Sequence, residues 1–358
     1  MTEAYIKLGE IATYINGYAF KPKDRGREGL PIIRIQDLTG NSNDKGFYKG
    51  KYPSKIEINN GDILISWSAS LGVYIWNSGR ALLNQHIFKV VFDKKAIDRD
   101  YFVYAVQFSL NKMKQLTHGA TMKHVVKKDF ENVSIPYPSL TEQRKIACIL
   151  DKLKKSMSKR LQELKKLDEL IKARFVEMFG DPVINNKNIK NQKLGDVCFL
   201  KAGEFTSSKT ISPVKTSINK YPCFGGNGIR GYVNNYTHQG NYSLIGRQGA
   251  LCGNVKFATG KFRNTEHAIL VSPKIEINSR WLFELLNLEK LNRFKSGAAQ
   301  PGLAVKTLNE VTIPVPGLKL QNEFANFVQQ VDKSKVAVQK SLDETQKLYD
   351  SLMQEYFG

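Results

Sequence analysis

The side chains of this chain that are best suited to chemistry are cations and amides on predicted loops. Arg247 and Gln248 precede Gly249 between two predicted strands. An arginine there can form two hydrogen bonds to guanine, and a glutamine can form two to adenine. A phosphate contact or a solvated turn is the alternative for both. Other candidate contacts to nucleic acid have similar side chains: Arg34, Gln36, Lys123, His124, Lys201, Asn227, Arg230 and Gln300.

The charge of the whole chain favours the same kind of partner. Its formal net charge is +21 over 358 residues, and each lysine or arginine that neutralises a phosphate releases a counterion. Residues 1–138, 139–192 and 193–316 are each basic, whereas residues 317–358 are nearly neutral. We therefore expect a polyanion as partner, nucleic acid first, with residues 139–192 closer to it than residues 317–358.

Motifs of several enzyme classes are missing from the sequence. It contains no Pro-Pro pair, so it lacks the loop with which DNA amino-methyltransferases hold their target base, and it has no Walker A motif for ATP-driven translocation. Glu163-Leu164-Lys165 matches part of a nuclease motif, but surface Glu and Lys pairs are expected on a helix there. We predict a non-catalytic DNA-binding chain. A nuclease with an unrecognised site and a scaffold that binds only protein are the alternatives.

Residues that could suggest a cofactor have ordinary structural explanations. His86 and His267 each precede an apolar segment without a companion ligand, so we expect hydrogen-bonded histidines and no metal site. We expect the four cysteines to be reduced and mostly buried. The three tryptophans, Trp67, Trp76 and Trp281, are predicted to lie in the core.

The hydropathy of the chain does not indicate a membrane protein. No stretch approaches the about 18 apolar residues that a membrane span needs, and the N-terminus lacks the apolar segment of a secretion signal. We expect a cytoplasmic protein with no membrane partner.

The candidate contacts lie in a sequence that repeats at an offset of 178 residues. Each copy reads Val-x-Ile-Pro-x-Pro-x-Leu-x-x-Gln and later ends in Phe-Gly. The matched positions are Val133, Ile135, Pro136, Pro138, Leu140 and Gln143 against Val311, Ile313, Pro314, Pro316, Leu318 and Gln321. A repeat of this length predicts two copies of one globular module, each followed by one long helix.

The two helices are predicted from their caps and their heptad spacing. Ser139 and Glu142 fit a capping box at the start of the first helix, and Gly180-Asp181-Pro182 fits its end. We predict that the two apolar stripes pack against each other as an antiparallel coiled coil, with each helix about 55 Å long. A coiled coil between two chains is the alternative. The predicted packing positions are Ile146, Leu150, Leu153, Met157, Leu164, Leu167 and Ile171 with Phe324, Val328, Val331, Val338, Leu342 and Tyr349.

The modules themselves read as short strands with glycine-rich turns, followed by a helical stretch. The expected fold class is α+β, with two similar mixed-sheet domains joined by the paired helices. We place the first module at 1–138, the central helix and linker at 139–192, the second module at 193–316 and the distal helix at 317–358.

The sequence resembles specificity subunits of type I restriction-modification systems. The resemblance rests on the order of module and helix, on the Ile-Pro-x-Pro-x-Leu-x-x-Gln motif, and on the runs 221–232 and 244–253. The similarity covers essentially the whole chain. It implies that each module is a target recognition domain that reads one half of a split DNA site. The paired helices would then space the two modules.

The same resemblance implies partners and cofactors. Double-stranded DNA, two copies of a DNA adenine methyltransferase subunit and the restriction and translocase subunits are the expected partners. S-adenosylmethionine, ATP and Mg²⁺ are expected on those partner subunits, and none is expected on this chain.

Overall fold

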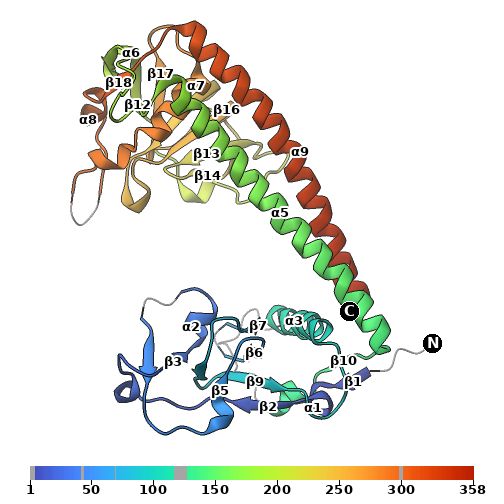
Figure 1. Ribbon diagram of the computed structural model, residues 1–358. Helices are drawn as coiled ribbons and strands as arrows, with labels where there is room; N and C mark the ends of the chain where they lie inside the picture. The colour runs from blue at the N-terminus through green and yellow to red at the C-terminus, as the bar shows by residue number, and fades with distance from the viewer. Residues whose placement is uncertain (1–4, 42–43, 69, 117–126, 298–300) are drawn as a thin grey trace. The chain divides into compact units, whose positions relative to one another are not determined.

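The computed structural model describes residues 5–41, 44–68, 70–116, 127–297 and 301–358. The chain divides into two compact units, one of residues 1–159 with 341–358 and the other of residues 160–340. Each unit therefore contains one module and about half of each long helix, α5 (Leu140–Phe179) and α9 (Leu318–Phe357) (Figure 1).

The module of the first unit consists of short strands and one long helix. Four strands pair in the order β2-β9-β6-β7, all antiparallel, and four more pair in the order β4-β3-β8-β5, where β3 and β8 run parallel. β1 pairs with β10. The elements are β1 (Tyr5–Lys7), α1 (Leu8–Ile11), β2 (Thr13–Asn16), β3 (Leu30–Ile33), α2 (Ile35–Leu38), β4 (Gly46–Tyr48), β5 (Glu57–Ile58), β6 (Ile63–Ser66), β7 (Gly72–Ile75), β8 (Ala81–Leu83), β9 (Ile87–Val91), α3 (Arg99–Leu116), α4 (Lys127–Glu131) and β10 (Ser134–Pro136).

The module of the second unit has one larger sheet. Its six strands pair in the order β12-β17-β15-β16-β13-β14, and only β13 and β16 run parallel. β11 pairs with β18. The elements are β11 (Asn191–Lys193), α6 (Leu194–Val197), β12 (Cys198–Ala202), β13 (Tyr221–Gly225), β14 (Gly228–Val233), β15 (His238–Gly246), β16 (Val255–Asn264), β17 (Ala268–Pro273), α7 (Ser279–Leu288), α8 (Val305–Asn309) and β18 (Thr312–Pro314). The mixed sheets confirm the predicted α+β class.

The two modules share backbone details as well as topology. The strand order β2-β9-β6 of the first corresponds to β12-β17-β15 of the second. A Cβ added at Gly17, after β2, would lie 2.0 Å from the carbonyl oxygen of Asn84, and one added at Gly203, after β12, would lie 2.4 Å from that of Asn264. No side chain fits at either place. Both modules therefore share the same close approach between two backbone segments, which indicates that the duplication extends to this detail.

Each long helix adds apolar side chains to the cores of both units. In the first unit, Ile146 and Leu150 of α5 belong to the same core as Met353 and Phe357 of α9. In the second unit, Ile171, Phe175 and Phe179 share a core with Phe324, Val328 and Val331. Each module core therefore continues into the helices, and burial of these side chains holds helix and module together.

The helices run antiparallel, as predicted. In the second unit, the ring of Phe175 lies 5.4 Å from that of Phe324, and the ammonium of Lys335 forms a 2.5 Å ion pair with Asp168. Residues later in α5 therefore contact residues earlier in α9, as in an antiparallel pair of helices (Figure 1). Along both helices the residues spaced by threes and fours are buried or half-buried. Half-buried members of these stripes are Leu153, Met157, Leu164, Leu167, Val338, Leu342 and Tyr349.

The caps of α5 agree with the sequence. The Glu142 backbone N–H donates to Ser139 Oγ at 3.3 Å. At the other end Gly180 has a φ of +79°, the left-handed conformation that ends a helix readily with glycine.

A buried glutamine joins each module to its helix. Gln143 Oε1 accepts the backbone N–H of Asp98 at 2.8 Å, and its Nε2 donates to the carbonyl of Pro138 at 2.9 Å. Gln321 makes the same two bonds, to Asn278 at 2.9 Å and to Pro316 at 2.8 Å. Both glutamines are almost fully buried. We call this arrangement the glutamine bridge; it explains why both copies of the repeat end their motif in Gln.

The residue that receives the glutamine bridge also caps the module helix. Asp98 Oδ1 accepts the backbone N–H of Tyr101 at 3.0 Å, at the start of α3. Asn278 Oδ1 accepts the N–H groups of Arg280 and Trp281 at the start of α7. The first turn of each module helix is thereby tied to the first turn of the long helix.

A second polar link between module and helix differs between the units. In the first, the Tyr104 hydroxyl donates to Asp151 at 2.6 Å, and the ammonium of Lys154 lies 4.7 Å from the centre of the Tyr104 ring. In the second, Arg280 forms ion pairs with Glu284 at 3.0 Å and Asp332 at 2.8 Å. Burial raises the pKa of Tyr104 and lowers that of Lys154.

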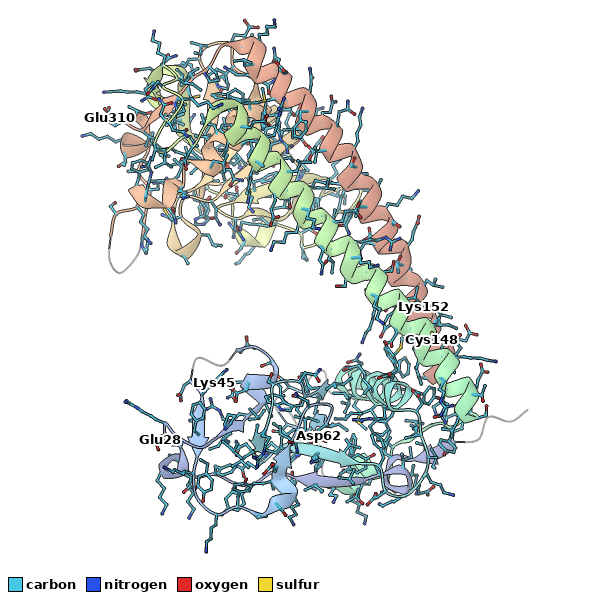
Figure 2. The ribbon with its side chains drawn as sticks, viewed as in Figure 1. Glu28, Lys45, Asp62, Cys148, Lys152 and Glu310 are labelled. Atoms are coloured by element: carbon cyan, nitrogen blue, oxygen red, sulfur yellow. The ribbon has the colours of Figure 1, made fainter. Side chains whose placement is uncertain are left out.

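The cysteines and Trp281 lie as expected, whereas Trp67 and Trp76 are less buried than expected. Among the described residues no helix is long and apolar enough to cross a membrane. All four cysteines are free, and only Cys148, near Lys152 on the first half of α5 (Figure 2), is exposed. Trp281 is fully buried. Trp67 and Trp76 are only half-buried, because their indole N–H groups bond to Asn16 and to Gly79 near the surface.

Replacing Gln143 or Gln321 by alanine should open the start of α3 or α7. The change leaves a buried N–H and a buried C=O without partners, which costs about 1–3 kcal/mol. Hydrogen exchange of the full chain should show faster exchange at Asp98 or Asn278 in the matching unit only. Gln162→Ala, on the exposed face of α5, serves as control, and equal protection in all variants would contradict the role of the bridge.

Candidate nucleic-acid interface

Several loops of the second unit meet at one end of its sheet. The Thr265 N–H donates to the carbonyl of Phe224 at 3.0 Å, which joins the β16–β17 turn to the end of β13. The Arg247 N–H donates to the carbonyl of His267 at 3.1 Å, and the Leu303 N–H donates to that of Arg247 at 2.9 Å. The segment after β15 therefore lies between the β16–β17 turn and residues 301–303.

Arg247 and Gln248, the first candidate contacts, lie in the middle of this loop cluster. Within the described residues the half-buried Arg247 side chain has no hydrogen-bond or ion-pair partner, and its Nε is shielded from solvent. Gln248 is exposed, and its Oε1 lies 3.0 Å from Nδ1 of His267. The two side chains therefore combine a free positive charge with an oriented amide.

His267 is held between Gln248 and an acid. Its Nε2 forms a 3.1 Å contact with Glu266 Oε1, and Glu266 Oε2 accepts the Thr206 N–H at 3.2 Å. Arg263 contributes a bond from Nε to the Thr206 hydroxyl at 2.9 Å. His267 is therefore a hydrogen-bonded histidine, as predicted from the sequence.

The other candidates of the second unit are spread along the sheet. Asn227 is exposed in the β13–β14 turn and accepts a bond from Asn254 at 3.2 Å. Arg230, on β14, and Lys201, on β12, are exposed, and no hydrogen bond or ion pair joins either side chain to the described part of the chain. β12 and β14 are the two edge strands of the six-stranded sheet. The structure therefore does not bring Lys201 and Arg230 together.

In the first unit one candidate is engaged internally and one is exposed. The backbone N–H of Arg34 donates to Asp37 Oδ2 at 2.8 Å, and its guanidinium contacts Asp37 at 3.5 Å and donates to the Asp44 carbonyl. Gln36 is exposed on α2. Lys123, His124 and Gln300 lie outside the described residues.

Some residues at these loops were missed by the sequence analysis. Glu266 and Arg263 carry no motif, and their neighbours in sequence do not reveal their partners. Glu266 stands next to His267 in the chain, but its role in holding that ring depends on the turn between β16 and β17. Trp67, expected in the core, occupies in the first unit the place that Arg247 occupies in the second: its backbone N–H donates to the carbonyl of His86 at 3.2 Å.

The described residues offer little for a metal or for cysteine chemistry. They contain no group of three His, Cys, Asp or Glu side chains that could hold a metal ion. Burial raises the pKa of Cys198 to about 12 and raises those of Cys223 and Cys252 as well. These three thiols therefore stay protonated and unreactive.

Comparisons of the sequence agree with a duplicated module. The model of the type I restriction modification DNA specificity domain matches residues 3–166 and again residues 186–346. The EcoprrI type I restriction enzyme specificity subunit of Escherichia coli is 31% identical over 353 residues, which cover 92% of this chain and 87% of that one. The MjaVIII specificity subunit of Methanocaldococcus jannaschii is 24% identical over 391 residues, covering 97% and 90%.

Comparisons of the structure show the same fold. The crystal structure of the S subunit of a type I restriction-modification system from M. genitalium has a TM-score of 0.62 at 17% identity, covering 100% of this chain and 96% of that one. A second structure, from work on complex assembly and conformational transition of the type I system, has a TM-score of 0.60 at 18% identity, covering 99% and 98%.

Arg230→Ala and Arg247→Ala should each weaken binding of the full chain to duplex DNA, because each removes an exposed or unpaired cation. Loss of one phosphate contact should reduce the slope of log binding constant against log salt concentration by about 0.9. Titrations at several salt concentrations measure this slope. Lys319→Ala, on the first turn of α9, removes the same charge elsewhere and should leave it unchanged. Slopes equal to that of the unaltered chain would exclude both arginines from phosphate binding.

Proposed function

The chain belongs to the specificity subunits of type I restriction-modification systems, whose role is DNA recognition rather than catalysis, and we propose that it reads a DNA site in two separate halves. Each module reads one half. The paired helices hold the two readers apart and determine the length of the unspecified sequence between the halves.

The observation that carries this proposal is one scaffold present twice in one chain. Both modules have the same central strand order, the same glycine approach at Gly17 and Gly203, and the same glutamine bridge to a 40-residue helix. Two similar DNA-reading modules on one chain suit a DNA target with two short runs of specified base pairs. Because the side chains of their loops differ, the two runs need not be identical.

The helices are suited to setting a distance. At 1.5 Å per residue a 40-residue helix is about 60 Å long, which exceeds one turn of B-DNA at about 34–36 Å. Each is anchored at both ends by apolar side chains in a module core, such as Leu150 and Phe179 on α5. A helix that is fixed in a module core at each end can set the distance between the two modules.

Catalysis in this proposal belongs to partner subunits. Two copies of a DNA adenine methyltransferase subunit dock on the helices and the adjacent edges of the modules, one on each copy of the repeat. The restriction and translocase subunits join through them, in the cytoplasm. Those partner subunits bind S-adenosylmethionine, ATP and Mg²⁺, and this chain binds none of these cofactors. The family membership and the repeated module–helix junction support this arrangement.

Exchanging residues 1–138 for the first module of another family member should replace one half of the recognised site only. Module and helix meet at the glutamine bridge, so the exchange should keep Gln143 and its partner position. Mapping methylated bases in cells that carry the altered complex gives both halves at once. The matched exchange of residues 193–316 should replace the other half. A change in both halves from either exchange would mean that the modules do not read independently.

Insertion of seven residues into both helices should lengthen the tolerated spacer without altering either half-site. Seven residues add about 10 Å and keep the heptad phase. Suitable points are Arg160 on α5 and Lys340 on α9, at the borders of the two units. The same mapping measures the spacer. Insertion into α5 alone leaves the stripes unequal and should impair assembly. Altered half-sites with an unchanged spacer would refute the role of the helices.

A further inference from the structure

One position in the shared scaffold carries different chemistry in the two modules. Ser66 at the end of β6 pairs with Ile87, and Gly246 at the end of β15 pairs with Ala268. The next residue, Trp67 or Arg247, donates its backbone N–H to the backbone carbonyl of the histidine before β9 or β17. By this register Trp67 corresponds to Arg247 and Ser68 to Gln248.

In the first unit this position is aromatic. The ring of Trp67 lies edge-on to that of His86 at 4.8 Å and stacks on that of Phe88 at 5.7 Å. Its indole N–H donates to Asn16 Oδ1 at 3.2 Å. The next residue, Ser68, has a side chain that is too short to reach as far outward as the Gln248 amide.

In the second unit the same position begins a chain of polar contacts. It runs from Gln248 to His267 at 3.0 Å, from His267 to Glu266 at 3.1 Å, and from Glu266 to the Thr206 N–H at 3.2 Å. A ring N–H at Nδ1 of His267 donates to Gln248 Oε1, and one at Nε2 donates to Glu266 Oε1. The acid end is anchored on the backbone of the loop after β12. These polar contacts therefore restrain the exposed Gln248 side chain, which would otherwise rotate freely.

The restrained amide keeps one acceptor and one donor edge free. An amide oxygen has two lone pairs, and His267 uses one of them, so Oε1 can accept a second bond while Nε2 donates. Adenine presents the complementary pair in the major groove, its N6 amino group as donor and N7 as acceptor. A carboxylate in place of the amide could only accept, which suits the N4 amino group of cytosine.

We propose that Gln248 reads one adenine in the half-site of the second module, and that His267 and Glu266 are positioning residues that hold its amide. The first module, with Trp67 and Ser68 at the corresponding place, reads its half-site without this contact. The inference rests on the proposed function, since it assigns one base to one of the two readers.

The test uses the full chain expressed with its methyltransferase subunit, and the relative methylation of genomic sites that differ at one base. Gln248→Glu should lower the preference for adenine at one position of one half-site about tenfold and favour cytosine there. His267→Ala should lower the same preference without creating a new one. His267→Asn should restore it, because the asparagine amide nitrogen can occupy the place of Nδ1 and donate to Gln248.

Controls separate this role from folding. Asn241→Ala, exposed on β15, the strand that precedes Gln248, should change no preference. The half-site of the first module should be identical in all variants. Unchanged adenine preference in Gln248→Glu, or failure of His267→Asn to restore it, would overturn the inference while a split site persists. A single specified run in the unaltered chain would remove the proposed function itself.

Discussion

The arrangement of this protein depends on one buried amide in each copy of the repeat. Gln143 and Gln321 use both ends of their side chains, the oxygen on the N-cap residue of the module helix and the nitrogen on a proline carbonyl. A buried amide that loses either partner is costly, so only one orientation of module and helix satisfies both. Two adjoining helix starts are thereby tied together. The strands β10 and β18, which pair with β1 and β11, end just before the prolines of the same junction.

Apolar packing continues from this junction along the helices. Phe175, Phe179 and Phe324 pack ring against ring beside Trp281, and Phe357 packs on Tyr101 in the other unit. Between these ends the residues of the stripe are only half-buried. The junctions are equivalent in their amides but not in their charges. Lys154 faces Tyr104 in one, and Asp332 faces Arg280 in the other. Duplication has therefore preserved the joint while the surfaces around it diverged.

The loops show the same division between preserved backbone and altered side chains. The turn before β9 and the turn before β17 carry histidines in matching places, and the strand beside each ends in the same register. One histidine packs against an indole, and the other lies between an acid and an amide. A backbone held by close contacts, such as those at Gly17 and Gly203, keeps its path while the side chains of the loops beside it differ. This is how one fold can present two different surfaces to DNA.

Features that depend on local pattern could be predicted from the sequence: the repeat, the α+β class, the heptad stripes, and the ends of α5 at Ser139 and Gly180. Caps and periodicity are properties of neighbouring residues, so they can be read without a structure. The partners that those residues meet depend on how the whole chain folds. Gln143 reaches Asp98, 45 residues away, and Arg34 is held by Asp37 and Asp44 rather than left exposed. The contact of Gln248 with His267 depends on the register of β15 against β17, which no local pattern specifies, because pairing between distant segments is set by packing of the whole core.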